Sequence, residues 1–141
     1  MVFIYKIEGG NFTKAGYASS EIKKLLKKLN IDVKIIKRIV IALYEAEVNV
    51  VAHAFAGEIT VEILKNIINI KITDEGPGIE DIEMAMQEGY STASEKVRQM
   101  GFGAGMGLPN IKRNCDKMKL ESVPGKGTSL SLTINFNYNN E

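Results

Sequence analysis

The chain has 141 residues, 45% of them hydrophobic and 25% charged, a composition typical of a soluble globular domain and unlike that of a disordered segment. A net charge of +1 argues against a nucleic-acid binder that depends on bulk electrostatic attraction. The apolar runs are too short to span a membrane and the N-terminus lacks a signal-peptide pattern, so we expect a cytoplasmic protein without a membrane partner.

The N-terminal segment predicts a strand followed by a helix. Residues 2–7 are rich in β-branched and aromatic side chains, which favours a strand. Asn11 or Thr13 is expected to cap a helix that Asn30 ends. Its apolar face comprises Ala18, Ile22, Leu25, Leu26 and Leu29.

A second, longer helix is predicted next. Asp32 is expected to cap it, and its apolar periodicity continues to about Phe55. Gly57 is expected to end the helix as its C-terminal breaker. The predicted buried positions are Ile36, Ile39, Val40, Leu43 and Val50.

The middle of the chain predicts a hairpin and a short helix. Apolar residues alternate with polar ones over 59–63 and again over 68–72, with a turn at Lys65-Asn66. A short helix is expected around residues 79–87. Residues 89–100 show no clear period, and a long polar segment of this kind is usually a lid or disordered.

The C-terminal part predicts one more helix and two strands. A glycine-rich run over 101–107 leads into the helix, and the strands are expected at 117–123 and 129–136. We therefore predict a single domain over 1–141. Its fold class is α/β (α+β), a two-layer sandwich in which a mixed, mostly antiparallel sheet has helices on one face.

Glu45 and Asn49 are candidate site residues on the second helix. They are four positions apart and so share a face. An amide oxygen is a suitable ligand for Mg²⁺, and a carboxylate can orient or deprotonate an attacking hydroxyl group. A solvated helix flank would explain the same pair.

Asp74, Gly76 and Gly78 follow the second strand of the hairpin. A buried carboxylate can accept a hydrogen bond from an exocyclic amine such as that of adenine, and glycines let a flat base lie against the backbone. An ordinary Asp-Gly turn is the alternative.

The glycine-rich run and the last turn are candidate ligand-contacting loops. Gly103, Gly105 and Gly107 precede a helix, where free N–H groups and the helix dipole favour phosphate. Thr128 begins a strand after Gly125-Lys-Gly127, and its hydroxyl could face the same pocket. Each run by itself would also fit a flexible loop or a turn.

Together the four motifs resemble the ATP-binding boxes of the GHKL superfamily, which includes histidine kinases, Hsp90 chaperones, type II topoisomerases and serine kinases of bacterial sigma-factor control. The motifs are Glu45-x-x-x-Asn49, Asp74-x-Gly76-x-Gly78, Gly103-x-Gly105-x-Gly107 and Gly125-x-Gly127-Thr128. The resemblance covers almost the whole chain and implies the GHKL ATPase fold.

The resemblance also implies roles for these residues. Asn49 would be the Mg²⁺ ligand, Glu45 the general base and Asp74 the adenine anchor, with residues 89–107 as an ATP lid. ATP and Mg²⁺ are the expected cofactors. The other residues expected to contact the nucleotide are Gly76, Gly78, Gly103, Gly105, Met106, Gly107, Leu108 and Thr128.

The chain is most similar to the stand-alone anti-sigma and stress-switch serine kinases. It has no segment for a phosphoacceptor histidine, and its only histidine, His53, is expected to be a helix-packing residue. Sporulation-type members often carry an arginine where Gly103 stands here. The expected lid is longer, with Lys96 and Arg98 as substitutes for contact with the γ-phosphate.

The family implies a protein kinase whose substrate is a STAS-domain regulator of the anti-sigma-antagonist type. A sigma factor or a phosphatase, and a homodimer, stay open as further partners. The alternative is a nucleotide-gated anti-sigma or partner-binding protein without significant kinase turnover. A basic flank of the first helix, formed by Lys23, Lys24, Lys27 and Lys28, is a candidate docking surface, or simply a solvated face.

Overall fold

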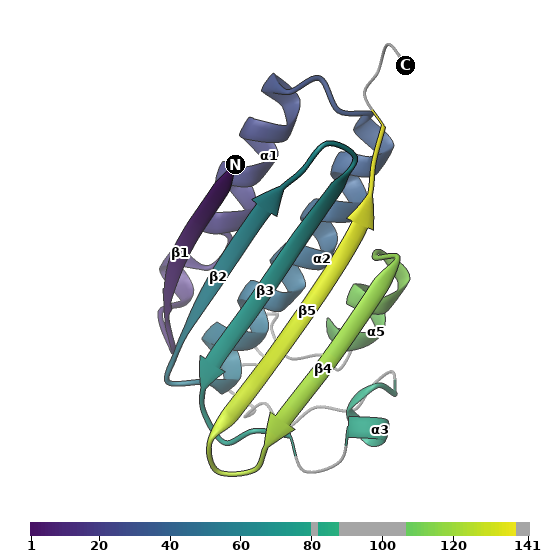
Figure 1. The fold of residues 1–141 in the computed structure, drawn as a ribbon. Helices are drawn as coiled ribbons and strands as arrows, with labels where there is room; N and C mark the ends of the chain where they lie inside the picture. Colours follow the sequence, from purple (N-terminus) through teal and green to yellow (C-terminus); the bar gives the residue numbers. More distant parts are fainter. Residues whose placement is uncertain (80–81, 88–106, 138–141) are drawn as a thin grey trace.

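The computed structural model describes residues 1–79, 82–87 and 107–137 (Figure 1). Its centre is one five-stranded sheet with the strand order β1-β2-β3-β5-β4. All four pairings between these strands are antiparallel. The strands are β1 (Val2–Glu8), β2 (Ala56–Ile63), β3 (Ile67–Glu75), β4 (Lys117–Val123) and β5 (Gly127–Asn135).

The helices cover one face of this sheet, so the predicted two-layer sandwich is confirmed (Figure 1). Helix α2 lies in the middle and contacts α1 on one side and α5 on the other. None of the described helices has the length and apolar content needed to cross a bilayer. The helical elements are the 3₁₀ turn η1 (Phe12–Lys14), α1 (Tyr17–Lys28), α2 (Val33–His53), α3 (Ile82–Ala85) and α5 (Gly107–Arg113).

The core forms where the alternating strand residues meet the apolar stripes of the helices. Val61 and Ile70 are register partners in the β2–β3 hairpin, and both are buried. Because side chains alternate across a strand, the polar residues between them face away from the helices. The fully buried residues include Ile22, Leu26, Ile39, Leu43, Ile59, Ile68, Ile111, Leu132 and Ile134.

The start of α2 confirms the predicted cap, whereas its end differs from the prediction. The Asp32 carboxylate accepts a hydrogen bond from the Lys34 backbone N–H at 3.1 Å. The helix ends at His53, and Gly57 lies inside β2 opposite Asp74. Gly57 is therefore a strand residue and not a helix breaker. A Cβ there would meet the Val50 side chain at 2.6 Å, so the close packing of β2 on α2 favours glycine at this position.

The start of α1 was predicted wrongly. Asn11 and Thr13 belong to the region of the 3₁₀ turn, and the helix begins only at Tyr17, after Gly16 in a left-handed conformation. No neighbouring side chain caps it. Its first N–H groups are instead bound by a residue of α2.

Glu47 caps α1 from the neighbouring helix. The residue is 1% exposed, and its two carboxylate oxygens accept hydrogen bonds from the N–H groups of Ala18 and Ser19, each at 3.1 Å. A carboxylate at a helix N-terminus is also favoured by the helix dipole. Glu47 therefore fixes α1 against α2, an interaction that no local sequence pattern indicates.

The helix predicted over 79–87 is shorter in the structure, where α3 covers Ile82–Ala85. The predicted strands at 117–123 and 129–136 correspond to β4 and β5. Most of the predicted lid, 89–107, lies outside the described residues, as do Gly103, Gly105 and Met106.

Candidate nucleotide site

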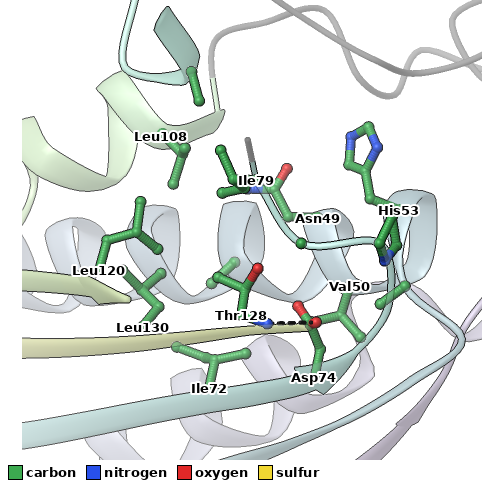
Figure 2. A pocket seen from close by; sticks show the side chains of 15 residues that line it. Asn49, Val50, His53, Ile72, Asp74, Ile79, Leu108, Leu120, Thr128 and Leu130 are labelled. Carbon is green, nitrogen blue, oxygen red and sulfur yellow. Dashed lines mark hydrogen bonds between the residues drawn. The ribbon is translucent and has the colours of Figure 1, made fainter. Parts of the chain in front are cut away.

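A cavity of about 350 Å³ lies between the second half of α2 and the sheet (Figure 2). Its walls are mainly apolar, with a few polar groups at defined places, as is typical of small-molecule sites. The lining residues are Ala46, Asn49, Val50, His53, Ala54, Ile72, Asp74, Pro77, Gly78, Ile79, Ala85, Leu108, Leu120, Thr128 and Leu130.

Asp74 and Thr128 form a hydrogen-bonded pair on the sheet side of the cavity (Figure 2). The Thr128 backbone N–H donates to Asp74 Oδ1 at 3.0 Å. Burial raises the pKa of the Asp74 carboxyl, and the Thr128 hydrogen bond opposes that shift only in part. The carboxylate is thus held in place by one oxygen, and its second oxygen can accept a hydrogen bond from a ligand amine.

Gly127 permits the close approach that this pair requires. A Cβ at Gly127 would collide with the backbone carbonyl oxygen of Asp74 and meet its Oδ1 at 3.2 Å. Because the obstacle is backbone, a small side-chain movement could not relieve the collision. The glycine before Thr128 therefore allows β5 to lie directly against the end of β3.

The loop after Asp74 is fastened to the turn between β4 and β5. The Gly76 N–H donates to Lys126 O at 3.1 Å, and the Gly125 N–H donates to Pro77 O at 2.7 Å. Gly78 has a φ of +74°, and a Cβ there would meet Val123 O at 2.5 Å. Gly78 lines the cavity, whereas Gly76 is a buried residue outside its lining.

Ser122 joins this loop to Thr128 and was missed by the sequence analysis. Its Oγ accepts a hydrogen bond from the Ile79 N–H at 2.7 Å and donates one to Gly127 O at 3.0 Å. It also lies 3.0 Å from Thr128 Oγ1. A polar residue at an inward position of an alternating strand is the signal that could have indicated it, since Leu120 occupies the preceding inward position.

Asn49 faces the cavity from α2, close to the start of α5. A Cβ at Gly107 would meet Asn49 Oδ1 at 2.9 Å, so this glycine allows the end of the glycine-rich run to pack on the Asn49 amide. Leu108, the next residue, lines the cavity. The structure thus brings Asn49 together with Gly107 and Leu108, and their contact with a nucleotide stays a prediction.

Glu45 does not line the described cavity. It is partly buried and lies four residues before Asn49, one turn away on the same helix. The structure therefore places Glu45 beside the site, and its role as a general base stays a prediction.

His53 belongs to the cavity wall, one turn after Asn49 (Figure 2). The prediction that it only packs against a helix is therefore incomplete. Burial lowers the pKa of the imidazole, which favours its neutral form. It lies four residues after Asn49, and this spacing from the candidate Mg²⁺ ligand is the signal that could have placed it on the same face of α2.

The fold is thus a two-layer sandwich with a mainly apolar cavity between helix and sheet, and the Asp74 carboxylate lies in the wall of this cavity. Residues 34–138 match the family described as "Histidine kinase-, DNA gyrase B-, and HSP90-like ATPase". The chain belongs to this family, the GHKL superfamily that its motifs resemble.

Two characterised relatives indicate the branch of the family. The chain is 37% identical over 122 residues to an anti-sigma F factor of Caldanaerobacter subterraneus subsp. tengcongensis, covering 83% of this chain and 82% of the relative. It is 37% identical over 97 residues to the serine/threonine-protein kinase RsbT of Bacillus subtilis, covering 66% and 67% of the two chains. These relatives are consistent with a GHKL domain of the anti-sigma and switch-kinase type.

A solved structure shows the same fold. The mycobacterial sensor histidine kinase MprB aligns with a TM-score of 0.55 over 98% of this chain and 99% of that chain. The two sequences are 14% identical, so this likeness concerns the fold alone.

Proposed function

We propose that this protein is a Mg-ATP-dependent serine/threonine kinase that phosphorylates a STAS-domain regulatory protein in a bacterial sigma-factor partner-switching pathway. The observation that carries the proposal is the cavity that combines the Asp74 carboxylate with the Asn49 amide on the opposing helix. Membership of the ATPase family and similarity to a serine/threonine kinase support it.

The adenine base would lie between the sheet and α2. Asp74 accepts a hydrogen bond from its exocyclic amine, while Ile72 and Leu130 provide apolar contacts from the sheet. The phosphates then extend toward Asn49 and Gly107 at the start of α5. In this arrangement the base is bound by the closed, apolar part of the site.

The residues present fit a magnesium ion bound together with ATP. The Asn49 Oδ1 is a hard oxygen beside the expected phosphates, and Mg²⁺ usually takes one or two protein ligands and completes its shell with water and phosphate oxygens. When bound, Mg²⁺ neutralises charge on the phosphates. Asn49 would hold it, and Leu108 would cover the site from α5.

Glu45 is proposed as the general base. A serine hydroxyl oxygen of the substrate forms a bond to the γ-phosphorus, the bond from that phosphorus to the bridging oxygen of ADP breaks, and Glu45 takes the hydroxyl proton. This role is supported by the position of Glu45 one turn before Asn49 on the same face of α2, next to the edge of the cavity.

We further propose that residues 1–141 act as a single domain in the cytoplasm. A sigma factor or a phosphatase is a candidate second partner, and a homodimer is a candidate assembly. The relatives called anti-sigma F factor support a sigma factor among the partners.

A nucleotide-gated binding protein without significant kinase turnover is the second candidate function. Its specific support is the position of Glu45 outside the cavity lining, together with relatives named as anti-sigma factors. In this alternative, ATP would change the affinity for a partner and no phosphate would be transferred.

Incubation with γ-labelled Mg-ATP and a candidate STAS-domain protein distinguishes the two functions. We expect label on the STAS-domain protein, and a rate lower by about a hundredfold or more in Glu45→Gln, with ATP binding retained. Asn49→Ala should lose Mg²⁺-dependent binding as well as transfer. ATP-dependent partner binding without any label transfer would favour the gated binder instead.

A further inference from the structure

Ser122 is at the centre of the hydrogen bonds behind the cavity. It lies on β4, outside the cavity lining, and its single hydroxyl contacts three groups from two other segments. These are the Ile79 N–H at 2.7 Å, the Gly127 carbonyl at 3.0 Å and the Thr128 hydroxyl at 3.0 Å.

The chemistry of a hydroxyl group determines the direction of the third bond. A serine hydroxyl has one hydrogen to donate and two lone pairs that accept. Ser122 gives its hydrogen to Gly127 O and uses one lone pair for the Ile79 N–H. With both of these bonds made, only the second lone pair of Ser122 is left for the Thr128 hydroxyl, so we assign Thr128 as the donor of a contact whose geometry allows either direction.

This direction determines what Thr128 presents to a ligand. Its only hydroxyl hydrogen points to Ser122, so Thr128 Oγ1 can only accept hydrogen bonds from the cavity. Asp74 also offers an acceptor, because its Oδ1 is bound by the Thr128 N–H and its other oxygen has no hydrogen when ionised. Both side chains line the cavity, so this part of its wall offers two neighbouring acceptors.

We propose that Ser122 is a positioning residue that determines purine specificity: by holding the Thr128 hydroxyl hydrogen, it makes the site accept a 6-amino purine and reject a 6-oxo purine. This inference rests on the proposed nucleotide site and deepens it. An exocyclic amine can donate to Asp74 and Thr128, whereas a carbonyl oxygen at the same place would face two acceptors. Unsatisfied acceptors in a buried site weaken binding.

The test compares ATP with inosine triphosphate, in which a carbonyl oxygen replaces the 6-amino group. Their dissociation constants are measured as Mg²⁺ complexes by calorimetry for the wild type and Ser122→Ala. Removing Ser122 frees the Thr128 hydrogen to turn into the cavity and donate to the 6-oxo oxygen. We expect the preference for ATP to decrease about tenfold, the equivalent of one hydrogen bond.

Two further variants separate this effect from simple loosening of the cavity wall. The double variant Ser122→Ala/Thr128→Val has no hydroxyl hydrogen that could donate to the 6-oxo oxygen. The improved affinity for inosine triphosphate relative to ATP, expected in Ser122→Ala, should therefore disappear. Ser131→Ala, the same substitution on the outward side of β5, should leave the preference unchanged. If Ser122→Ala does not fold, Ser122→Cys, a similar shape with a much weaker hydrogen-bonding group, should shift the preference in the same direction.

Each result decides between explanations. If Ser122 had a purely structural role, Ser122→Ala would weaken the binding of both nucleotides equally, and the ratio of their dissociation constants would keep its wild-type value. That result would overturn the inference and leave the proposed nucleotide site in place. A wild type that binds neither nucleotide would overturn the proposed site and this inference together.

Discussion

At the scale of a single residue, the partly buried carboxylate of Asp74 lowers the stability of the free protein at neutral pH and is expected to increase its affinity for ATP. The residue is placed in a mainly apolar cavity, and burial raises the pKa of its carboxyl despite the hydrogen bond from Thr128. In the free protein the ionised side chain therefore lacks part of the solvation it would have in water. A ligand amine would supply the missing hydrogen bond.

Asp74→Asn is expected to lower ATP affinity about 30- to 1000-fold, because it removes a charge-assisted hydrogen bond and places an amide group where an acceptor is required. Nucleotide titration of the folded variant measures this change. Asp116→Asn is a suitable control, since Asp116 binds Arg38 and the Asn135 N–H away from the cavity. Wild-type affinity in Asp74→Asn would exclude the adenine role.

The raised pKa of Asp74 also predicts a pH dependence. If Asp74 anchors adenine, ATP should bind the ionised carboxylate more tightly. The contribution of Asp74 to ATP affinity should then be constant at neutral pH and fall as the pH decreases through the pKa of Asp74, which lies above the ordinary value of 3.8. Asp74→Asn should lack this component. A wild-type affinity that decreases no more than that of the variant would contradict the assignment.

The raised pKa of Asp74 also makes the stability of the fold depend on pH. Because the folded state raises the pKa of Asp74, this group stabilises the fold below its unfolded pKa, and that contribution is lost as pH rises through the folded pKa. At neutral pH without nucleotide, Asp74→Asn should therefore melt at a higher temperature than the wild type. A lower melting temperature would indicate that the carboxylate is needed for the fold itself.

At the scale of the elements, helix α1 depends on a residue of α2. Glu47 is nearly inaccessible and binds the first N–H groups of α1, while Gly16 supplies no capping side chain. The same helix α2 carries Asn49 and His53 in the cavity wall. The packing of α1 and the geometry of the nucleotide site are thus set by one helix, on different faces.

Glu47→Ala should lower the free energy of unfolding by about 2–4 kcal/mol, because it leaves buried N–H groups without acceptors and creates a cavity. Urea denaturation measures the change. Glu45→Gln, two residues earlier and more exposed, is the matched control and should change stability by less than about 0.5 kcal/mol. Equal effects of the two substitutions would argue against the capping role.

At the scale of the whole molecule, α1 and α5 lie on opposite sides of α2, so the outer flank of α1 is separate from the cavity (Figure 1). Lys23, Lys24, Lys27 and Lys28 are exposed on this flank, and none forms an ion pair among the residues that the structure describes. Four neighbouring positive charges without acidic partners favour contact with an acidic protein surface.

Reversal of charge at Lys24 and Lys28, to glutamate, should weaken partner binding and leave ATP affinity unchanged, because neither residue lines the cavity. Partner affinity measured at two salt concentrations is the test, and the wild type should show the steeper salt dependence. Lys117 and Lys119, on the exposed edge strand β4, provide a control pair. Unchanged partner binding in the α1 variant would exclude this surface.

The sequence by itself determined the elements that depend on local periodicity and capping. Alternation over 59–63, 68–72 and 129–136 indicated the central strands, because a pleated strand exposes every second side chain to the same face. Asp32 indicated the start of α2 through a hydrogen bond within two residues. The order of four short motifs indicated the family, and with it Asp74 and Thr128 as neighbours.

Only the tertiary structure decided the contacts between residues distant in the chain. The N-terminus of α1 is capped by Glu47, 28 to 29 residues later, and the loop at 76–79 is held by Ser122 and the turn at 124–127. The alternation of β4 could single out Ser122 as an inward polar residue, but no pattern names its partners or those of Glu47, because hydrogen bonds between separate elements depend on how those elements pack. For the same reason the sequence placed Glu45 and Asn49 on one helical face, and packing alone put Asn49 in the wall of the cavity and Glu45 beside it.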